Sequence, residues 1–179
     1  MLKWIYAPSQ LFKTTIDGEE IQGNSAIYFY KKFTVEGKIV SAKIDISARG
    51  LYNGYINGEK ICDSYLNPGW CDYRKTIRYQ TYDVAHLIQE GENAIGCILG
   101  NGWFGGCVGL LNQRNYNGSN MLWAVLNIET TTMKYTIATD DSWLYSTGAI
   151  KYNDLLNGEF VNALDEIEDF ATVDCDTKN

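Results

Sequence analysis

The side chains best suited to chemistry in this sequence are oxygen-rich and lie together near its C-terminal end. Asp154, Asn157 and Glu159 follow Asn153 within one short stretch, and Ca²⁺ binds carboxylate and amide oxygens of this kind. The stretch lacks the spacing of an EF-hand loop, and Asn and Asp are also favoured in ordinary turns. Two interpretations therefore stand at this point: a calcium site at Asp154, Asn157 and Glu159, or a turn.

A second group combines glycines with an aromatic ring in residues 99–106, Leu-Gly-Asn-Gly-Trp-Phe-Gly-Gly. A glycine cluster after an apolar strand resembles a phosphate-binding loop, but neither a helical pattern nor a lysine follows, so we expect no nucleotide site. Asn101 and Trp103 could meet a polar ligand at the edge of a sheet. The alternative is a tight turn that packs Trp103 into the core, because glycine tolerates sharp bends.

Catalytic groups are harder to find. Cleavage of a sugar bond needs an acid and a base, two carboxyl groups roughly 5 to 9.5 Å apart. Asp140 and Asp141 open a turn, and the acidic residues within 166–169 form a charged run. The single histidine, His86, has no accompanying Gly-x-Ser-x-Gly motif. We therefore predict no catalytic residue in this chain.

The charge and hydropathy of the chain exclude several partners. The 179 residues include 15 basic and 22 acidic ones, a formal net charge of −7, which disfavours binding to nucleic acid. No stretch approaches the ~18 apolar residues that span a bilayer, and the start, Met-Leu-Lys-Trp, lacks the apolar core of a secretory signal. We expect a cytoplasmic protein with no membrane partner, although a chain whose signal had been removed would read the same.

The cysteines predict no metal centre. They stand at positions 62, 71, 97, 107 and 175, with no Cys-x-x-Cys pair and one histidine in the chain, so the spacing of a zinc site is missing. Their odd number leaves at least one thiol unpaired, and Cys97 lies in an apolar run that suits a small buried side chain. We expect all five to be reduced.

Alternation of apolar and polar residues predicts most of the secondary structure. It is clearest in residues 38–48, as a half-buried strand requires. Further strands are expected over residues 26–33, 75–82, 94–99, 121–130 and 133–139. Asn57-Gly58 predicts a hairpin turn between strands over residues 51–56 and 60–63. One or two helical turns are expected within residues 83–90.

These elements predict one all-β domain, an antiparallel β-sandwich with at most one short helix. Residues 1–25 would form a lead-in strand and loop, and residues 26–175 the sandwich; residues 165–179 read as an acidic, weakly apolar end. The chain has 13 tyrosines, five tryptophans and six phenylalanines. Tyrosine suits a half-buried sheet surface, and it also stacks on sugar rings.

Several motifs occur in an order that is similar to the N-terminal domain of bacterial α-L-rhamnosidases. They are residues 50–58 (GLYNGYING), 65–75 (YLNPGWCDYRK), 77–84 (IRYQTYDV), 91–93 (GEN), 100–104 (GNGWF), 140–143 (DDSW), 146–148 (STG) and 157–159 (NGE). Each motif is weak alone, but their order and spacing extend the resemblance over most of residues 1–175.

The resemblance implies a multidomain glycoside hydrolase whose (α/α)6-barrel catalytic domain inverts configuration with two carboxylates. That barrel would follow this sequence and is absent from it, so the parent protein would be the α-L-rhamnosidase, while this chain alone would hydrolyse no rhamnoside. The sandwich would be a jelly-roll, galactose-binding-like accessory domain that assists recognition of rhamnose-containing glycans. No cofactor is required, but related sandwiches include calcium-dependent rhamnose-binding modules. The alternative is a structural brace against the barrel that binds no sugar.

If the domain binds sugar, we predict a site where the loop of residues 100–106 approaches residues 153–159. Rhamnose presents a methyl and C–H face that Trp103 would cover, and hydroxyls that Asn101, Asn157 and Glu159 would bond. Glu159, if ionised, could instead hold a Ca²⁺ ion that meets two sugar hydroxyls. Loops at opposite ends of the sandwich, or a fully buried Trp103, would favour the brace.

Overall fold

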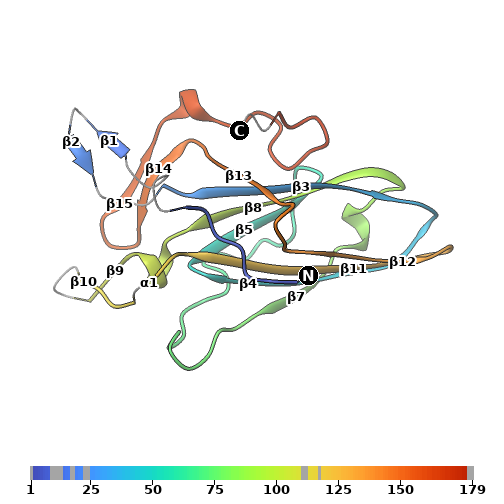
Figure 1. Cartoon of the computed structure of the whole chain (residues 1–179), viewed down its shortest axis with the longest axis horizontal. Coiled ribbons are helices and arrows are strands. Elements are labelled where there is room, and N and C mark those ends of the chain that lie inside the picture. Colours follow the sequence, from blue (N-terminus) through green and yellow to red (C-terminus); the bar gives the residue numbers. More distant parts are fainter. Residues whose placement is uncertain are drawn as a thin grey trace.

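The computed structural model describes residues 2–8, 14–16, 19–21, 25–109, 113–116 and 118–176. Two antiparallel sheets pack face to face (Figure 1). One contains, in spatial order, β12 (Lys134–Ala138), β11 (Met121–Thr130), β4 (Ile39–Arg49) and β7 (Gln80–Asp83). The other contains β13 (Leu144–Thr147), β3 (Ile27–Val35), β8 (Gly91–Gly100), β5 (Leu51–Ile56) and β6 (Glu59–Lys60). The predicted antiparallel β-sandwich is confirmed.

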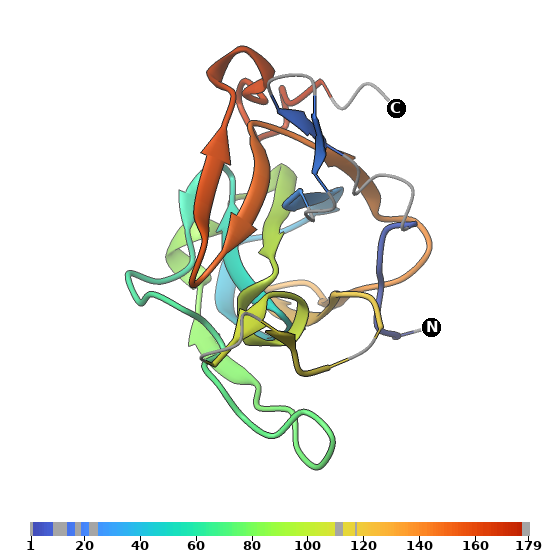
Figure 2. The same cartoon turned by 90° about the vertical axis from the view of Figure 1, so that its left-hand side faces the viewer.

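Where the structure is described, three two-stranded hairpins lie outside these sheets, and all three are at one end of the sandwich (Figures 1 and 2). They pair β1 (Thr14–Ile16) with β2 (Glu19–Ile21), β9 (Cys107–Val108) with β10 (Gln113–Arg114), and β14 (Ile150–Asp154) with β15 (Gly158–Val161). Among the described residues, helical structure is limited to α1 (Gly102–Gly105), η2 (Ala85–Leu87) and η3 (Ala163–Asp165). No helix in the described ranges is long and apolar enough to cross a bilayer.

The core lies between the sheets, where the strands place every second side chain. Leu122 and Leu126 of β11 and Ile44 of β4 are completely buried, and they pack in the same cluster as Phe29 and Cys97 of the opposite sheet. Full burial of one such aliphatic side chain contributes about 1.5 to 3 kcal/mol. Burial also raises the pKa of the Cys97 thiol, and all five cysteines are free thiols.

The hairpin predicted at Asn57-Gly58 is confirmed, with β5 and β6 as its strands. Both turn residues have positive φ, 51° and 83°, as a type I′ turn requires. The Asn57 amide donates to the Leu87 carbonyl at 2.9 Å, and its oxygen accepts the N–H of Ala94 at 2.8 Å. The turn is therefore bonded both to η2 and to the neighbouring strand β8.

Two local predictions were wrong and one was confirmed. The strand predicted over residues 75–82 begins only at Gln80, because the backbone N–H groups of Lys75 and Thr76 donate to the Asp72 carbonyl and close a turn there. The helical turn expected within residues 83–90 is present as one 3₁₀ turn, η2. A helical turn, α1, forms within the glycine-rich residues 99–106, where no helix was expected.

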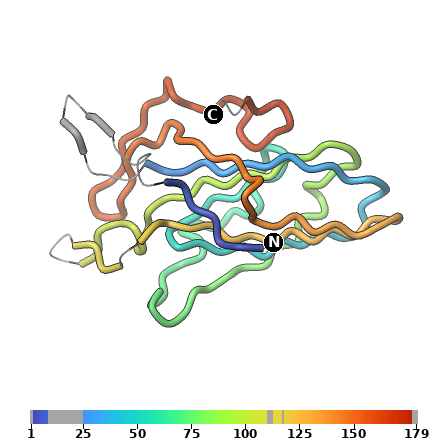
Figure 3. The backbone as a smooth tube through the Cα atoms, in the orientation of Figure 1, coloured from blue at the N-terminus to red at the C-terminus, as the bar shows by residue number. Residues whose placement is uncertain are grey.

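The chain after β15 returns over the outer face of the five-stranded sheet (Figure 3). We call residues 162–176 the C-terminal segment. The Phe170 ring packs edge-on against Tyr28 and Tyr55, with ring centroids 5.2 and 5.8 Å apart. The Tyr30 hydroxyl donates to the Thr172 carbonyl at 2.9 Å. The segment predicted to be an acidic, weakly apolar end thus contributes apolar side chains to a second cluster, which joins Ile167, Phe170 and Val173 to Tyr30, Ala94 and Cys175.

Candidate functional site

The loop of residues 100–106 and the β14–β15 hairpin lie side by side at one end of the sandwich (Figure 2). The backbone N–H of Asn101 donates to Asn153 Oδ1 at 2.6 Å, and Asn101 Nδ2 donates to the Asn153 carbonyl at 2.7 Å. The N–H of Cys107 donates to Asp154 Oδ2 at 2.7 Å. Direct hydrogen bonds therefore hold together the two segments that the sequence analysis singled out.

Asn101 is a connecting residue within this arrangement. Its side chain is 2% exposed, and its Oδ1 accepts a 2.7 Å hydrogen bond from Asn120 Nδ2. Together with the bonds to Asn153, this joins α1, β14 and the start of β11. A buried amide that loses a hydrogen-bond partner costs stability. The bonds of Asn101 therefore hold α1, β14 and the start of β11 in fixed relative positions.

Asp154 organises the turn of the hairpin. Its Oδ1 accepts the N–H groups of Leu156 and Asn157, at 2.9 and 3.0 Å, and the side-chain amide of Asn157 at 3.2 Å. Burial raises the pKa of Asp154, but the backbone N–H donors of Cys107, Leu156 and Asn157 outweigh it, and the pKa lies below its ordinary value. The carboxylate is therefore ionised at neutral pH and engaged in hydrogen bonds.

A pocket of about 230 Å³ opens beside this hairpin. Its apolar lining includes the Tyr65 ring, Leu66 and Leu155, and its polar lining includes Asn53, Asn153, Asp154 and Glu159. Tyr65 is 85% exposed, and its loop is held by the backbone bond from Tyr52 N–H to the Asn67 carbonyl at 2.9 Å. The pocket thus combines an exposed ring with carboxylate and amide groups.

The structure separates the predicted sugar-binding residues. Glu159 lines the pocket, as does Asp154 of the predicted calcium set. Trp103 is half-buried and packs on a different cluster, formed by Cys71, Tyr73, Phe104 and Tyr116. Asn157 is exposed at the hairpin turn and bonded to Asp154. Of the four side chains predicted to contact sugar, only Glu159 belongs to the pocket lining.

Sequence reasoning missed Tyr65, Leu66 and Asn53. Tyr65 and Leu66 stand directly before the turn Asn67-Pro68-Gly69, a position that exposes neighbouring side chains. That signal was available, but nothing local indicated that this loop meets the β14–β15 hairpin. Asn53 is exposed on β5, within a strand whose alternate residues Tyr52 and Gly54 are buried.

Calcium binding at Asp154 would compete with hydrogen bonds that this carboxylate already accepts. Asp154 already accepts four hydrogen bonds with its two oxygens, so a cation would have to displace some of these N–H donors. Within the described part of the chain, no group of three or more His, Cys, Asp or Glu side chains is placed to hold a metal ion. Calcium at Asp154, Asn157 and Glu159 stays a prediction.

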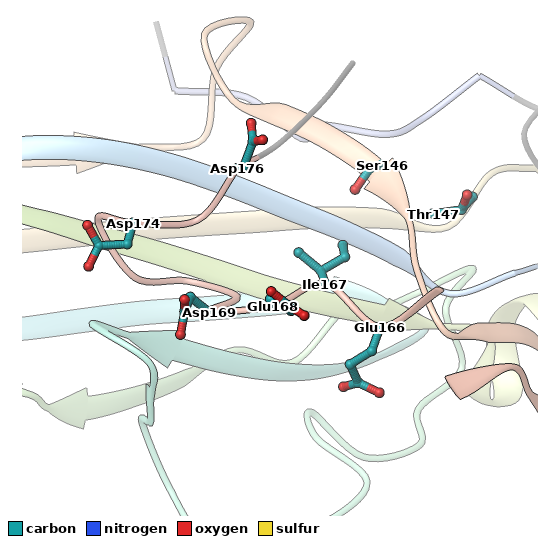
Figure 4. A pocket seen from close by; sticks show the side chains of 8 residues that line it. All are labelled: Ser146, Thr147, Glu166, Ile167, Glu168, Asp169, Asp174 and Asp176. Carbon is teal, nitrogen blue, oxygen red and sulfur yellow. The ribbon is translucent and has the colours of Figure 1, made fainter. Parts of the chain in front are cut away.

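A second pocket, of about 340 Å³, lies between β13 and the C-terminal segment (Figure 4). Ser146, Thr147, Ile167 and five acidic side chains line it: Glu166, Glu168, Asp169, Asp174 and Asp176. Their carboxylates point in different directions (Figure 4), and the lining contains no aromatic ring. This pocket lacks the stacking surface that the first one has.

Comparisons with known proteins agree with one another. A family profile described as the alpha-L-rhamnosidase N-terminal domain matches residues 37–179. An alpha-L-rhamnosidase of Streptomyces avermitilis is 36% identical over 132 residues, which cover 72% of this chain and 13% of the relative; one from Formosa agariphila is 30% identical over 168 residues, 88% of this chain and 17% of the relative. The chain therefore spans about a seventh of the length of these relatives.

Solved structures give the same result. The Streptomyces avermitilis alpha-L-rhamnosidase in complex with L-rhamnose superposes with a TM-score of 0.84 and 31% identity, over 87% of this chain and 15% of that one. The alpha-L-rhamnosidase of Aspergillus terreus gives a TM-score of 0.82 and 34% identity, over 91% and 19% of the two chains.

Proposed function

We propose, from the premise that the chain belongs to the family of α-L-rhamnosidase N-terminal domains, that it is a non-catalytic accessory domain that assists recognition of rhamnose-containing glycans. Its catalytic partner would be the (α/α)6 barrel of the same, longer polypeptide. The support for a longer polypeptide is the small share of each relative that the chain covers.

The observation that carries the sugar-binding proposal is the pocket between Tyr65, Asn53 and the β14–β15 hairpin. An exposed tyrosine ring can cover the C–H face of a sugar while amide and carboxylate oxygens accept its hydroxyls. Leu66 and Leu155 supply an apolar wall for the methyl group that distinguishes a 6-deoxyhexose. A pocket of about 230 Å³ suits one sugar ring.

The test is calorimetric titration of the chain with L-rhamnose. Tyr65→Ala and Glu159→Gln should abolish the heat of binding, because the first removes the stacking ring and the second the charged acceptor. Trp103→Ala is the matched aromatic control and should retain binding, since Trp103 packs on another cluster. Circular dichroism checks that each variant is folded.

The outcomes separate the alternatives. Loss of binding in Trp103→Ala with binding retained in Tyr65→Ala would move the site to the loop of residues 100–106. No heat with the unmodified chain, at any rhamnose concentration tried, would reject sugar binding and favour the brace. A parallel titration after dialysis against a calcium chelator tests calcium: binding restored only by added Ca²⁺ would support an ion at Asp154, Asn157 and Glu159.

Absence of catalysis is tested with an aryl α-L-rhamnoside. The chain alone should release no aryl alcohol, because no pair of its carboxyl groups is recognisable as acid and base. The longer polypeptide should turn over the same substrate. Turnover by the chain alone, lost in Asp154→Asn or Glu159→Gln, would overturn the non-catalytic assignment.

A further inference from the structure

Three aromatic rings form a row across the outer face of the four-stranded sheet. Ile5 pairs with Leu122 beside β11, which places Trp4 opposite Trp123. Trp123 is the register partner of Ser47 on β4. The ring centroids of Trp4 and Trp123 are 6.5 Å apart, and those of Tyr79 and Trp123 are 6.3 Å apart. We call Trp4, Trp123 and Tyr79 the aromatic row.

The alternation of the strands shows that the row faces outward. Leu122 and Ala124, the neighbours of Trp123, belong to the buried core. Trp4 and Trp123 are half-buried, and Tyr79, just before β7, is 62% exposed. Ser47 is only 2% exposed. Its small side chain leaves room for the rings of Trp123 and Tyr79 to meet above it.

The surroundings of the row have the composition of a protein–protein interface. Met121 and Arg49 are register partners in the adjacent row of the sheet, and the Arg49 Nη1 lies 3.7 Å from the Met121 sulfur. The Arg49 guanidinium carbon lies 5.7 Å from the Phe104 ring centroid, and no carboxylate among the described residues pairs with it. Trp, Tyr, Met and Arg are the residues enriched in interface cores and hot spots.

The tilt of the rings distinguishes a protein partner from a glycan chain. The ring planes of Trp4 and Trp123 differ by 36°, and those of Tyr79 and Trp123 by 68°. Rings that stack on successive sugars of one strand must present their faces to it together, and these do not. An uneven aromatic surface suits interdigitation with protein side chains instead.

The two outer faces of the sandwich also differ in what covers them. The C-terminal segment covers the five-stranded sheet through Phe170 and its neighbours, whereas no such cluster among the described residues includes the aromatic row. A contiguous exposed apolar surface is typical of a binding face. A second copy of the chain is the weaker candidate, because two chains of net charge −7 repel each other.

We infer that the aromatic row is the surface on which another domain of the same α-L-rhamnosidase polypeptide docks. The inference rests on the proposed place of this chain within a longer protein. The docked surface would be apolar opposite Trp4, Trp123 and Tyr79, and would bring a carboxylate or carbonyl oxygen to Arg49.

Hydroxyl-radical footprinting, read by mass spectrometry, tests this directly because tryptophan, tyrosine and methionine are the side chains that it modifies. The 179-residue chain and the longer polypeptide are labelled under the same conditions. We expect a several-fold lower oxidation of Trp4, Tyr79 and Trp123 in the longer polypeptide. Tyr65, 85% exposed in the pocket beside the β14–β15 hairpin, is the control and should label equally in both.

A variant adds an independent measurement. Tyr79→Ser should lower the melting temperature of the longer polypeptide more than that of the 179-residue chain, since only the former has the contact to lose. Equal oxidation of the row in both proteins would overturn the inference.

Two other results would also overturn it by identifying a different occupant. The first is protection of the row in the 179-residue chain alone at high concentration, with sedimentation as a dimer. The second is protection of the row by a rhamnose oligosaccharide. Neither depends on the pocket at Tyr65, so failure of rhamnose to bind there leaves this inference standing and the two results distinguishable.

Discussion

The outer faces of the two sheets both carry aromatic side chains, but they differ in which parts of the chain contact these rings. On the five-stranded sheet, Tyr28, Tyr30 and Tyr55 meet the C-terminal segment through ring contacts and a hydrogen bond. On the four-stranded sheet, the ring contacts of Trp123 among the described residues are those with Trp4 and Tyr79. One face is therefore covered by the C-terminal segment, whereas no comparable segment among the described residues covers the aromatic row.

The difference follows from sequence as much as from topology. A sheet that is apolar on both faces must be covered on both. Gly96, on the outer face of β8, leaves room for the chain to approach closely: a Cβ there would lie 2.6 Å from the Ala171 Cβ. The four-stranded sheet has the small Ser47 at the corresponding place, but it is covered by its own neighbouring rings and not by a distant segment.

The largest expected effect comes from removing the principal contact of the covered face. Phe170→Ala should lower the free energy of unfolding by about 2 to 3 kcal/mol, less than the ~3 to 5 kcal/mol of a fully buried phenylalanine, because the ring is half-buried. Urea denaturation measures the change. Leu164→Ala, at a side chain 93% exposed, is the control and should stay within about 0.5 kcal/mol of the unmodified chain. Equal losses of stability in Phe170→Ala and Leu164→Ala would show that Phe170 does not anchor the C-terminal segment on the five-stranded sheet.

A smaller loss is expected from filling the space at Gly96. Gly96→Ala should cost about 1 to 2 kcal/mol, because the new methyl group would lie within 3 Å of both Ala171 and Phe170. The double variant with Phe170→Ala sharpens the test: the two losses should not add, since removing the ring relieves part of the overlap. Strict additivity would show that the C-terminal segment does not press on β8.

The loop between β12 and β13, which connects the two sheets, makes the stability of the fold depend on pH. Asp140 lies between β12 and β13, and hydrogen bonds from the Ser142 side chain and backbone, with the Lys31 ammonium, lower its pKa to about 2. A carboxyl whose folded pKa is below its unfolded value of ~3.9 stabilises the protein above that value and loses this contribution as the pH falls towards 2.

Asp140→Asn should therefore be less stable than the unmodified chain at pH 7 and should lose less stability between pH 5 and pH 2. Urea unfolding at a series of pH values measures both. Parallel stability curves for the two proteins would show that Asp140 makes no such contribution.

The smallest effect is expected on the uncovered face. Tyr79→Ala in the 179-residue chain should cost no more than about 1 kcal/mol, since the ring is mostly exposed and contributes chiefly its contact with Trp123. Thermal unfolding followed by circular dichroism measures it. A loss as large as that of Phe170→Ala would show that the aromatic row is already a structural core of the chain, and would remove the distinction between the faces.

The central strands could be predicted from the sequence because burial alternates along the whole of β11 and along most of β4. Residues 38–48 and 121–130 correspond to β4 and β11 almost residue for residue. Residues 75–79 alternate in the same way, yet the ladder with β4 ends at Gln80. Beyond that point the Ser47 hydroxyl donates to the Arg78 carbonyl, a tertiary bond that no local pattern records.

The candidate site could be predicted only in part, for a related reason. Turn-forming residues indicated both loops, and the structure brings them together through Asn101 and Asn153. The direction of each side chain was not predictable, because the helical turn α1 directs Trp103 towards the cluster of Tyr73 and Phe104. Tyr65 comes from a loop whose position depends on packing among segments distant in sequence.

The contact between Gly58 and Ala171 bears on how the chain is made. The Gly58 N–H donates to the Ala171 carbonyl at 3.0 Å, so the C-terminal segment closes onto a hairpin that is synthesised more than 100 residues earlier. Long-range contacts of this kind slow folding. Until the segment arrives, the tyrosines of β3 and β5 face water on a growing polypeptide, where exposed apolar sheet surface invites association with neighbouring chains. By closing over these tyrosines, the C-terminal segment removes that sheet surface from contact with other chains.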